Sequence, residues 1–480
     1  MEKEEKKNEL VEIKGSLTAV LVLVTLVSTF GSSFQYGYNV ASVNSPSPFM
    51  KDFYNETIIY RSGSSISNSF LSLLWSLTVS LYPLGGLIGS LMVGPLVNKI
   101  GRKGTLLFNN IFSIIPAILM GTSVLSKSFE VIIASRLVIG ICAGLSSNVV
   151  PMYLGEMSPK NLRGGIGVMP QLMITIGILM AQIFGIRFIL GNTEGWPILL
   201  GITGIPAVFE LLSLPFFPES PRYTLLHKGK EGKAKKALQR LRACEDVDDE
   251  IEEMYLEDQS EKSEGQLSVK NLCSFRPLRW QLICIIALNM GQQLSGINAV
   301  YYYADSIYLS AGVEANTVQY VTVATGAVNV VMTLAAETVS WMPYLSIACI
   351  ITYVIGHAIG PSPIPYVITT EMFRQASRPS AFMVAGSVHW LSNFIVGLIF
   401  EFLMQGLGSY CFILFACICL ATFIFIYIVV PETKGKTFLE VSQLMAKRNG
   451  IEERPEFQDL NTTLHETPLE KNDCINLKQL

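Results

Sequence analysis

About eleven apolar stretches of roughly 20 residues run along the chain, separated by short polar segments. A stretch of this length is sufficient for a helix to cross the hydrocarbon core of a bilayer. Because backbone polar groups in lipid must bond within their own segment, we expect each stretch to be an α-helix. The expected spans are 17–40, 71–97, 105–125, 130–153, 166–190, 196–217, 281–306, 318–336, 341–370, 381–405 and 410–430.

Composition agrees with this pattern, since 50% of the 480 residues are hydrophobic and only 15% are charged. A soluble domain would carry roughly a quarter charged residues. The nine cysteines fall in apolar stretches or in expected cytosolic segments, which argues against disulfides, and no His/Cys spacing is typical of a metal site. The sequence therefore predicts an all-α membrane protein that is not an enzyme, with no cofactor, no metal and no nucleic-acid partner.

Charged motifs at the ends of the apolar stretches occur twice. The arginines of one motif stand 215 residues apart, and the glutamates of another stand 213 apart. Two motifs that recur at nearly one offset indicate an internal duplication, and parallel halves are typical of one large class of secondary transporter. The recurring positions are Glu156 with Arg163, Glu371 with Arg378, and Glu219 with Glu432.

Lysine and arginine gather after the second and fourth stretches and in 222–242. By the positive-inside rule these loops and the N-terminus are cytoplasmic, which leaves Asn55 outside, in a glycosylation sequon. The segment 228–263 suits short amphipathic helices on the inner face, and a solvated charged linker is the open alternative. The expected organisation is a cytoplasmic tail at 1–16, a six-helix bundle at 17–217, a linker at 218–279, a second bundle at 280–430 and a cytoplasmic tail at 431–480.

Five short motifs stand in one order along the chain: Gly101–Gly104, Pro218–Arg222, Gln292–Asn298, Gly360–Pro365 and Pro431–Thr433. Together they resemble those of the facilitative hexose transporters of the major facilitator superfamily, over roughly residues 16–445. The resemblance implies a two-bundle fold of twelve membrane helices and a hexose as substrate. His389-Trp390 and Ser362 look most like the fructose-transporting member, whereas Tyr366 departs from the small residue expected there.

A hexose is a neutral polyol, so its site needs amides and hydroxyls that donate and accept, with an aromatic platform. Amides inside membrane helices are costly and typical of functional sites, although they also join helices to one another. Such amides stand at Gln171, Gln292, Gln293, Asn298 and Asn329. The resemblance implies sugar contacts at these five positions and at Tyr36, His357, Ser362, His389 and Trp390.

His357 and His389 are each open to three interpretations: a proton relay, a neutral donor to a sugar hydroxyl, or a helix–helix hydrogen bond. No acidic residue stands close in sequence to either, which favours the neutral donor. Trp390 suits a sugar face, and plain packing is the alternative. Three prolines within 360–365 predict a kink, for which a moving gate is favoured over a static bend.

The charged residues at the inner ends of the stretches predict a latch that holds an outward-open state. Exposed pairs contribute little singly, but a network that breaks on opening biases a two-state equilibrium. A solvated rim is the alternative. The latch positions are Arg102, Glu156, Arg163, Glu219, Arg222, Glu371, Arg378 and Glu432.

Residues 17–40 contain no Asp or Glu, whereas proton-coupled carriers resembling this family keep an acid in the first helix. The favoured function is therefore uncoupled, facilitative hexose transport, fructose preferred, by a monomer in the plasma membrane. The alternatives are a non-transporting truncated variant or a sugar-binding receptor, and, less favoured, a proton-coupled symporter. Apical sorting is one option for the location, and retention in the endoplasmic reticulum is another if the shortened chain misfolds.

The second half of the duplication is incomplete. Only four residues separate Ala336 from Trp341, where the family pattern needs a cytoplasmic Gly-Arg-Arg loop and a ninth helix. We therefore expect ten or eleven membrane helices instead of twelve. If 318–336 spans, the basic segments after it lie outside, against the positive-inside rule. This conflict predicts that 318–340 is irregular or re-entrant and that the C-terminal tail is inside.

Overall fold

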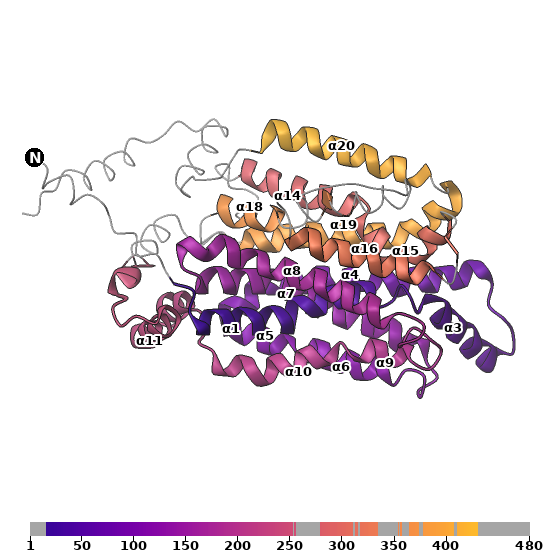
Figure 1. The fold of residues 1–480 in the computed structure, drawn as a ribbon, viewed down its shortest axis with the longest axis horizontal. Helices are drawn as coiled ribbons and strands as arrows, with labels where there is room; N and C mark the ends of the chain where they lie inside the picture. The colour runs from indigo at the N-terminus through magenta and orange to yellow at the C-terminus, as the bar shows by residue number, and fades with distance from the viewer. Residues whose placement is uncertain are drawn as a thin grey trace, which may run out of the picture.

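Two groups of packed helices lie side by side along the molecule, N-terminal helices in one group and C-terminal helices in the other (Figure 1). The computed structural model describes residues 16–252, 254–255, 279–310, 313–314, 317–334, 354, 356–357, 364–373, 378–407 and 410–430. Over these residues the secondary structure is helical throughout, with no β-strand. The all-α fold predicted from the apolar stretches is confirmed.

The N-terminal half begins with α1, whose first turn is capped by Thr18. The Thr18 hydroxyl accepts from the backbone N–H of Leu21 at 3.2 Å and donates to the carbonyl of Leu241 at 2.7 Å, which ties α1 to the linker helix α11. The elements are α1 (Ala19–Ser28), η2 (Thr29–Phe34), α2 (Gln35–Ala41), α3 (Ser47–Ser62), α4 (Asn68–Ile100), α5 (Arg102–Asn109), α6 (Ile111–Gly121), α7 (Phe129–Met157), η3 (Lys160–Leu162), α8 (Arg163–Phe184), α9 (Trp196–Gly201), α10 (Gly204–Ser213), η4 (Leu214–Phe216), η5 (Tyr223–His227) and α11 (Glu231–Arg242).

The C-terminal half contains one sharp break that matters for the site. Gly296 separates the first two helices at φ = +94°, a backbone conformation that side-chain-bearing residues rarely adopt. The break lets Gln293 and Asn298, on either side of it, turn toward the same space. The elements are α14 (Arg279–Leu294), α15 (Ile297–Ser310), α16 (Val318–Leu334), α18 (Ile364–Met372), α19 (Arg378–Leu407) and α20 (Cys411–Val429).

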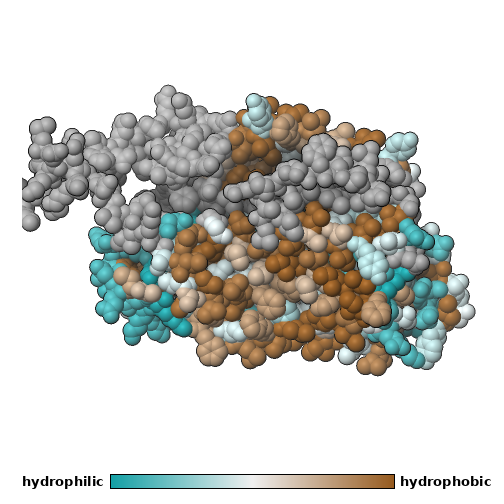
Figure 2. All heavy atoms as spheres, viewed as in Figure 1, coloured by the Kyte–Doolittle hydropathy of each residue, from teal (hydrophilic) through white to brown (hydrophobic). Residues whose placement is uncertain are grey.

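Nine helical segments of the described residues are long and apolar enough to cross a membrane. They correspond to nine of the eleven predicted spans, with ends that differ by a few residues. Hydrophobic residues cover the middle of the molecule between two hydrophilic ends (Figure 2), as a bilayer-embedded protein requires. We call these ends the α11 end and the α3 end, after the helices that lie there (Figure 1).

The predicted span 318–336 is a regular helix, α16, over its described part, so the prediction of an irregular stretch is wrong there. Its polar residues do not break the helix because they find partners. Thr322 donates to Asp305 at 2.7 Å, and the hydroxyls of Thr325 and Tyr308 bond at 2.6 Å. Most of the predicted span 341–370 lies outside the described residues.

The two halves meet most closely where α4 packs on α19. A Cβ atom at Gly86 would overlap the ring of Trp390, and one at Gly386 would overlap the amide of Asn148. The halves approach to backbone distance here because glycine leaves the space for a ring or an amide. Trp390 is fully buried in this contact and donates from Nε1 to Ser147 at 3.4 Å.

Candidate functional site

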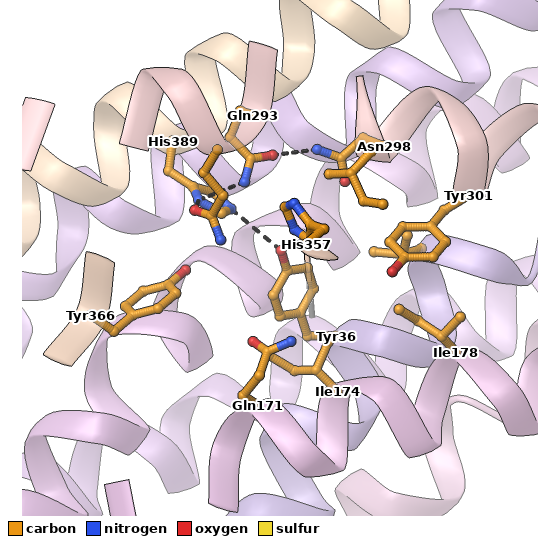
Figure 3. A pocket seen from close by; sticks show the side chains of 13 residues that line it. Tyr36, Gln171, Ile174, Ile178, Gln293, Asn298, Tyr301, His357, Tyr366 and His389 are labelled. Atoms are coloured by element: carbon orange, nitrogen blue, oxygen red, sulfur yellow. Dashed lines mark hydrogen bonds between the residues drawn. The ribbon is translucent and has the colours of Figure 1, made fainter. Parts of the chain in front are cut away.

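A cavity of about 40 Å³ lies between the two halves near the middle of the molecule (Figure 3). Helices α2 and α8 line it from the N-terminal half, and α14, α15, α18 and α19 line it from the C-terminal half. Its walls carry amides, imidazoles, phenols and aliphatic side chains, and none of the described lining residues is Asp, Glu, Lys or Arg. The lining residues are Tyr36, Val40, Gln171, Ile174, Ile178, Gln292, Gln293, Ile297, Asn298, Tyr301, His357, Tyr366 and His389.

A chain of hydrogen bonds crosses the cavity wall through His389 (Figure 3). Asn298 donates from Nδ2 to Gln293 Oε1, and Gln293 Nε2 lies 3.0 Å from His389 Nδ1. The same Nδ1 lies 3.3 Å from Gln292 Oε1, and Nε2 of the imidazole lies 3.3 Å from Tyr36 Oη. Which ring nitrogen donates depends on the tautomer of His389. The contact of His389 with Tyr36 joins the two halves directly.

His357 is the unsatisfied polar group of the cavity. Its side chain is 8% exposed and points into the space between Tyr36, Asn298 and Tyr301 (Figure 3). Its Nδ1 is buried and has no hydrogen-bond partner. A buried polar atom without a partner is costly, so this nitrogen is set up to bond a ligand hydroxyl.

Seven of the ten sequence-predicted sugar contacts line the cavity: Tyr36, Gln171, Gln292, Gln293, Asn298, His357 and His389. Asn329 is not among the lining residues, but its Nδ2 donates to the Oη atom of the lining residue Tyr301 at 2.9 Å. Trp390 lies outside the lining, buried against Gly86, so the packing alternative describes its position. Ser362 falls outside the described residues.

Tyr301 and Tyr366 line the cavity but were not among the predicted sugar contacts. Tyr301 follows Asn298 by three residues on α15, so helical periodicity places both on one face. In the sequence, Tyr366 stands out only because it differs from the small residue that the family pattern leads one to expect there. Its ring centroid lies 6.1 Å from that of His389, which brings a third phenol to the site.

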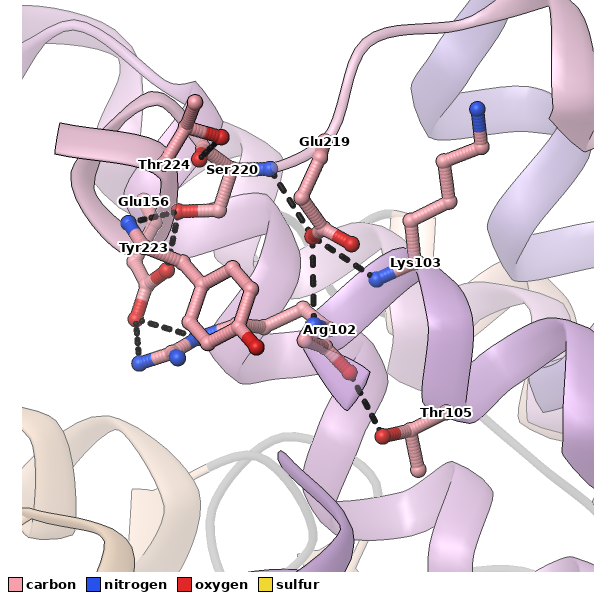
Figure 4. A network of polar contacts seen from close by, with 9 residues as sticks. Arg102, Lys103, Thr105, Glu156, Glu219, Ser220, Tyr223 and Thr224 are labelled. Carbon is pink, nitrogen blue, oxygen red and sulfur yellow. Dashed lines mark hydrogen bonds and ion pairs between the residues drawn. The ribbon is translucent and has the colours of Figure 1, made fainter. Parts of the chain in front are cut away.

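The charged cluster at the α11 end is built from the N-terminal half (Figure 4). Arg102 donates from Nε and Nη2 to one oxygen of Glu156 at 3.0 and 2.8 Å, and both side chains are about 95% buried. Glu156 also accepts from the hydroxyl of Ser220. The Arg102 guanidinium lies 5.3 Å from the ring centroid of Tyr223, a distance typical of a cation–π contact.

Glu219 caps the first turn of α5 instead of pairing with a basic side chain. Its Oε1 accepts from the backbone N–H groups of Arg102 at 3.1 Å and Lys103 at 2.9 Å, and Oε2 accepts from Gly104 at 3.3 Å (Figure 4). A helix N-terminus carries partial positive charge and unpaired donors. The carboxylate therefore fixes the loop before η5 to the start of α5.

The predicted latch residues have the following contacts and positions, and the latch itself stays a prediction. The contacts of Arg102, Glu156 and Glu219 stay within the N-terminal half. In the C-terminal half Arg378 donates to the carbonyl of Phe373 at 3.2 Å. Arg163 begins α8, Arg222 precedes η5 and Glu371 lies on α18, while Glu432 lies outside the described residues.

Asn55 of the sequon lies on α3, at the end opposite the charged cluster (Figure 1). Its Oδ1 accepts from the backbone N–H of Ile66 at 3.2 Å, which leaves its Nδ2 free of that bond. The amide nitrogen is the atom that a glycan would modify.

The helical fold and the cavity shared by two halves define a membrane transporter of the two-bundle class. The proton:xylose symporter XylE superposes with a TM-score of 0.75 at 24% identity, over 90% of this chain and 100% of that one. The partially occluded inward-open form of XylE from E. coli superposes with a TM-score of 0.71 at 22% identity, over 88% of this chain and 100% of that one. These matches establish the major facilitator fold.

The chain belongs to the sugar transporter family, because the model described as "Sugar (and other) transporter" matches residues 24–340 and 334–445. Solute carrier family 2, facilitated glucose transporter member 5, is 60% identical in sheep, over 92% of this chain and 95% of that protein. The human protein of the same name is 61% identical, over 93% of this chain and 96% of that protein. Human facilitated glucose transporter member 7 of the same solute carrier family is 52% identical, over 91% of this chain and 92% of that protein.

The same comparisons locate the incomplete repeat. The two matched segments meet at 334–340, so the family model is interrupted there. The sheep alignment spans 475 positions but uses 92% of 480 residues, about 442, so about 33 positions of the relative have no counterpart here. This length fits the one helix and loop whose loss the sequence predicts.

Replacing Glu219 with alanine removes three acceptor contacts at the start of α5. We expect Glu219→Ala to lower the free energy of unfolding by about 2 kcal/mol, since hydrogen bonds to charged groups contribute roughly 1.5–3 kcal/mol. Thermal unfolding of the detergent-purified protein measures the change. Glu194→Ala, at an exposed carboxylate on the turn after α8, is the matched control, and an equal loss in both variants would refute the capping role.

Proposed function

We infer that this protein is a facilitative hexose carrier that works by alternating access, with fructose as its favoured substrate. The observation that carries the proposal is the cavity between the halves, where neutral amides and phenols surround the unpartnered Nδ1 of His357. Such a lining can exchange hydrogen bonds with a polyol and offers no counter-charge to an ionic substrate. The relatives named as facilitated glucose transporters support the same substrate class.

The small size of the cavity fits a state of the cycle that holds no sugar. A volume of about 40 Å³ accepts one or more water molecules but not a hexose. The halves touch on both sides of the cavity, at Gly94 and Met383 toward the α11 end and at Asn44 and Asp305 toward the α3 end. Entry of sugar therefore requires one set of contacts to separate while the other holds, which is alternating access.

The preference for fructose rests on the residues of the wall. His389 occupies the position at which the fructose-transporting member differs from glucose-preferring ones, and its imidazole lies within hydrogen-bond distance of Gln293 and Tyr36. A sugar hydroxyl that displaces either contact keeps the network satisfied. Competition of fructose and glucose for binding tests this point, and a higher affinity for glucose would overturn it.

A non-transporting, sugar-binding protein is the second candidate, and the interruption at 334–340 is the observation that favours it. None of the described cavity-lining residues comes from α16. Loss of a helix and loop at the interruption would remove helix packing from the C-terminal half. Binding without uptake would identify this candidate, and restoring a helix and loop at 336–341 would then restore transport.

Sugar contacts can be separated from structural amides on one helix. Gln171 and Gln182 both lie on α8, but only Gln171 lines the cavity. We expect Gln171→Ala, and likewise Gln292→Ala or His389→Ala, to weaken sugar binding by about 1–3 kcal/mol through unpaired hydroxyls. Gln182→Ala should leave the dissociation constant unchanged. Isothermal titration or competition binding measures both, and equal effects would remove Gln171 from the site.

Transport without a coupling ion predicts a simple result in proteoliposomes. Labelled fructose should equilibrate across the membrane but not accumulate, and an imposed pH gradient should leave the final level unchanged, because residues 17–40 carry no acid. Accumulation against the sugar gradient would establish the symporter alternative instead. Protein-free vesicles provide the control for passive leak.

Orientation follows from the same proposal, with the α11 end and both tails inside and Asn55 outside, at the plasma membrane. Two sequons report it: Asn55 and Asn461, in the tail beyond the described residues. We expect glycan at Asn55 alone, detected as a single mobility shift that Asn55→Gln removes and Asn461→Gln does not. Glycan on Asn461 would show that the tail has crossed and that loss of one helix has inverted every later segment of the chain.

A further inference from the structure

A carboxyl group stands at membrane depth in the N-terminal half, apart from the sugar cavity. Glu210, on α10, is 0% exposed and is not among the residues that line the cavity. It falls within Trp196–Phe216, a segment long and apolar enough to cross a membrane. Acidic side chains are costly in such segments and usually have a function. The partners and the charge state of Glu210 therefore decide what it does.

The side chain of Glu210 is seated against the first membrane segment. The hydroxyl of Ser32, on η2, lies 2.8 Å from Oε2 and 3.0 Å from Oε1. A Cβ atom at Gly31 would stand 2.3 Å from Cβ and 2.5 Å from Oε2 of Glu210, so glycine is what leaves room for the carboxyl group. The segment η2 is a π-helix, a rare geometry that is frequent at functional sites. The backbone of the first segment is therefore shaped around this carboxyl group.

Among the elements packed most closely on α10, no described side chain is a cation that could balance a charge on Glu210. These elements are α1, η2, α6 and η4, and as described they contain no Lys, Arg, His, Asp, Glu, Cys or Tyr. From α7, the Cys142 thiol and the Tyr153 phenol interact with Glu210 electrostatically, and both groups are neutral at ordinary pH. Two further partners, the Ser32 hydroxyl and the Asn110 amide, are neutral donors.

An ionised carboxylate among apolar helices needs a cationic partner to offset its lost hydration. The described partners of Glu210 are neutral, so the protonated acid is the form that this place accommodates. We propose that Glu210, held by Ser32 over Gly31, is a proton-binding site that carries its proton in the resting protein. The ligand of this site is H⁺, which exchanges with water, and the site is separate from the wall of the sugar cavity.

The proton site lies one helical turn from the cavity along the first segment. Ser32 precedes Tyr36 by four residues, and Tyr36 lines the cavity and contacts His389 of the other half. Loss of the proton leaves a charge at Glu210, and separation of α10 from η2 is the way to hydrate that charge. We expect this separation to displace Tyr36 and to slow the passage of sugar. This consequence, unlike proton binding itself, rests on the carrier function inferred above.

Infrared difference spectroscopy of the purified protein tests proton binding directly. Glu210→Gln keeps the size of the side chain but cannot ionise, so subtracting its spectrum leaves the signal of Glu210. We expect the C=O stretch of a protonated carboxyl group at about pH 7, where an ordinary Glu is ionised. The band should be lost by about pH 10, above the range in which buried carboxyl groups are known to titrate. Absence of the band at about pH 7, or its persistence at about pH 10, overturns the proposal.

Two serines one helical turn apart supply a matched pair of variants. Ser32→Ala removes the hydroxyl beside Glu210, so the C=O band should move to higher frequency. Ser28→Ala removes a similarly buried hydroxyl that donates to the carbonyl of Val24 at 2.8 Å, and it should leave the band where it is. Equal shifts in the two variants, or no shift in Ser32→Ala, would show that the proton is not held at this contact and would overturn the proposed site.

Uptake separates the proton site from the function on which its consequence rests. In proteoliposomes with equal pH on both sides, the parent protein should take up labelled fructose severalfold more slowly at about pH 9 than at about pH 7, whereas Glu210→Gln should keep one rate at both. Equal pH dependence in parent and variant would overturn the control of sugar passage by Glu210. A protonated band in a chain that takes up no sugar would keep the proton site and remove the carrier function, and uptake without the band would do the reverse.

Discussion

A polar group buried among lipid-embedded helices has no water to bond, so its partner must come from the protein. The backbone meets this constraint by forming helices, and the side chains meet it locally. Thr322 and Asn329 bond to neighbouring helices, and Glu219 occupies the donors at the start of α5. Several buried side-chain atoms have no partner, and Nδ1 of His357 is the one among them that belongs to a described residue of the cavity wall.

The helices were predictable because a long apolar stretch allows few other structures in a bilayer. Most of the polar wall was also predictable, since Gln171, Gln293 and Asn298 have no reason to stand in apolar helices unless they bond something. Other partners were not. Glu219 binds backbone N–H groups, which no pattern of charged residues reveals. Trp390 neighbours His389 in sequence yet turns about 100° away around the helix and packs on Gly86.

The two halves of the duplication have unequal tasks in this chain. The N-terminal half holds its own charged cluster, with Arg102 and Glu156 almost fully buried. The C-terminal half supplies eight of the thirteen described lining residues, although the family model is interrupted within it.

The contact of Gly86 with Trp390 also has a mechanical meaning. Gly86 stands near the middle of α4, a helix of 33 residues that extends roughly 50 Å. With a flat ring pressed on bare backbone, the two halves have little freedom to slide but can tilt against each other. At roughly 25 Å from such a fulcrum, a tilt of about 10° carries each end of the helix about 4 Å, in opposite directions. If the halves tilt about this contact, the length of α4 sets how wide each end opens.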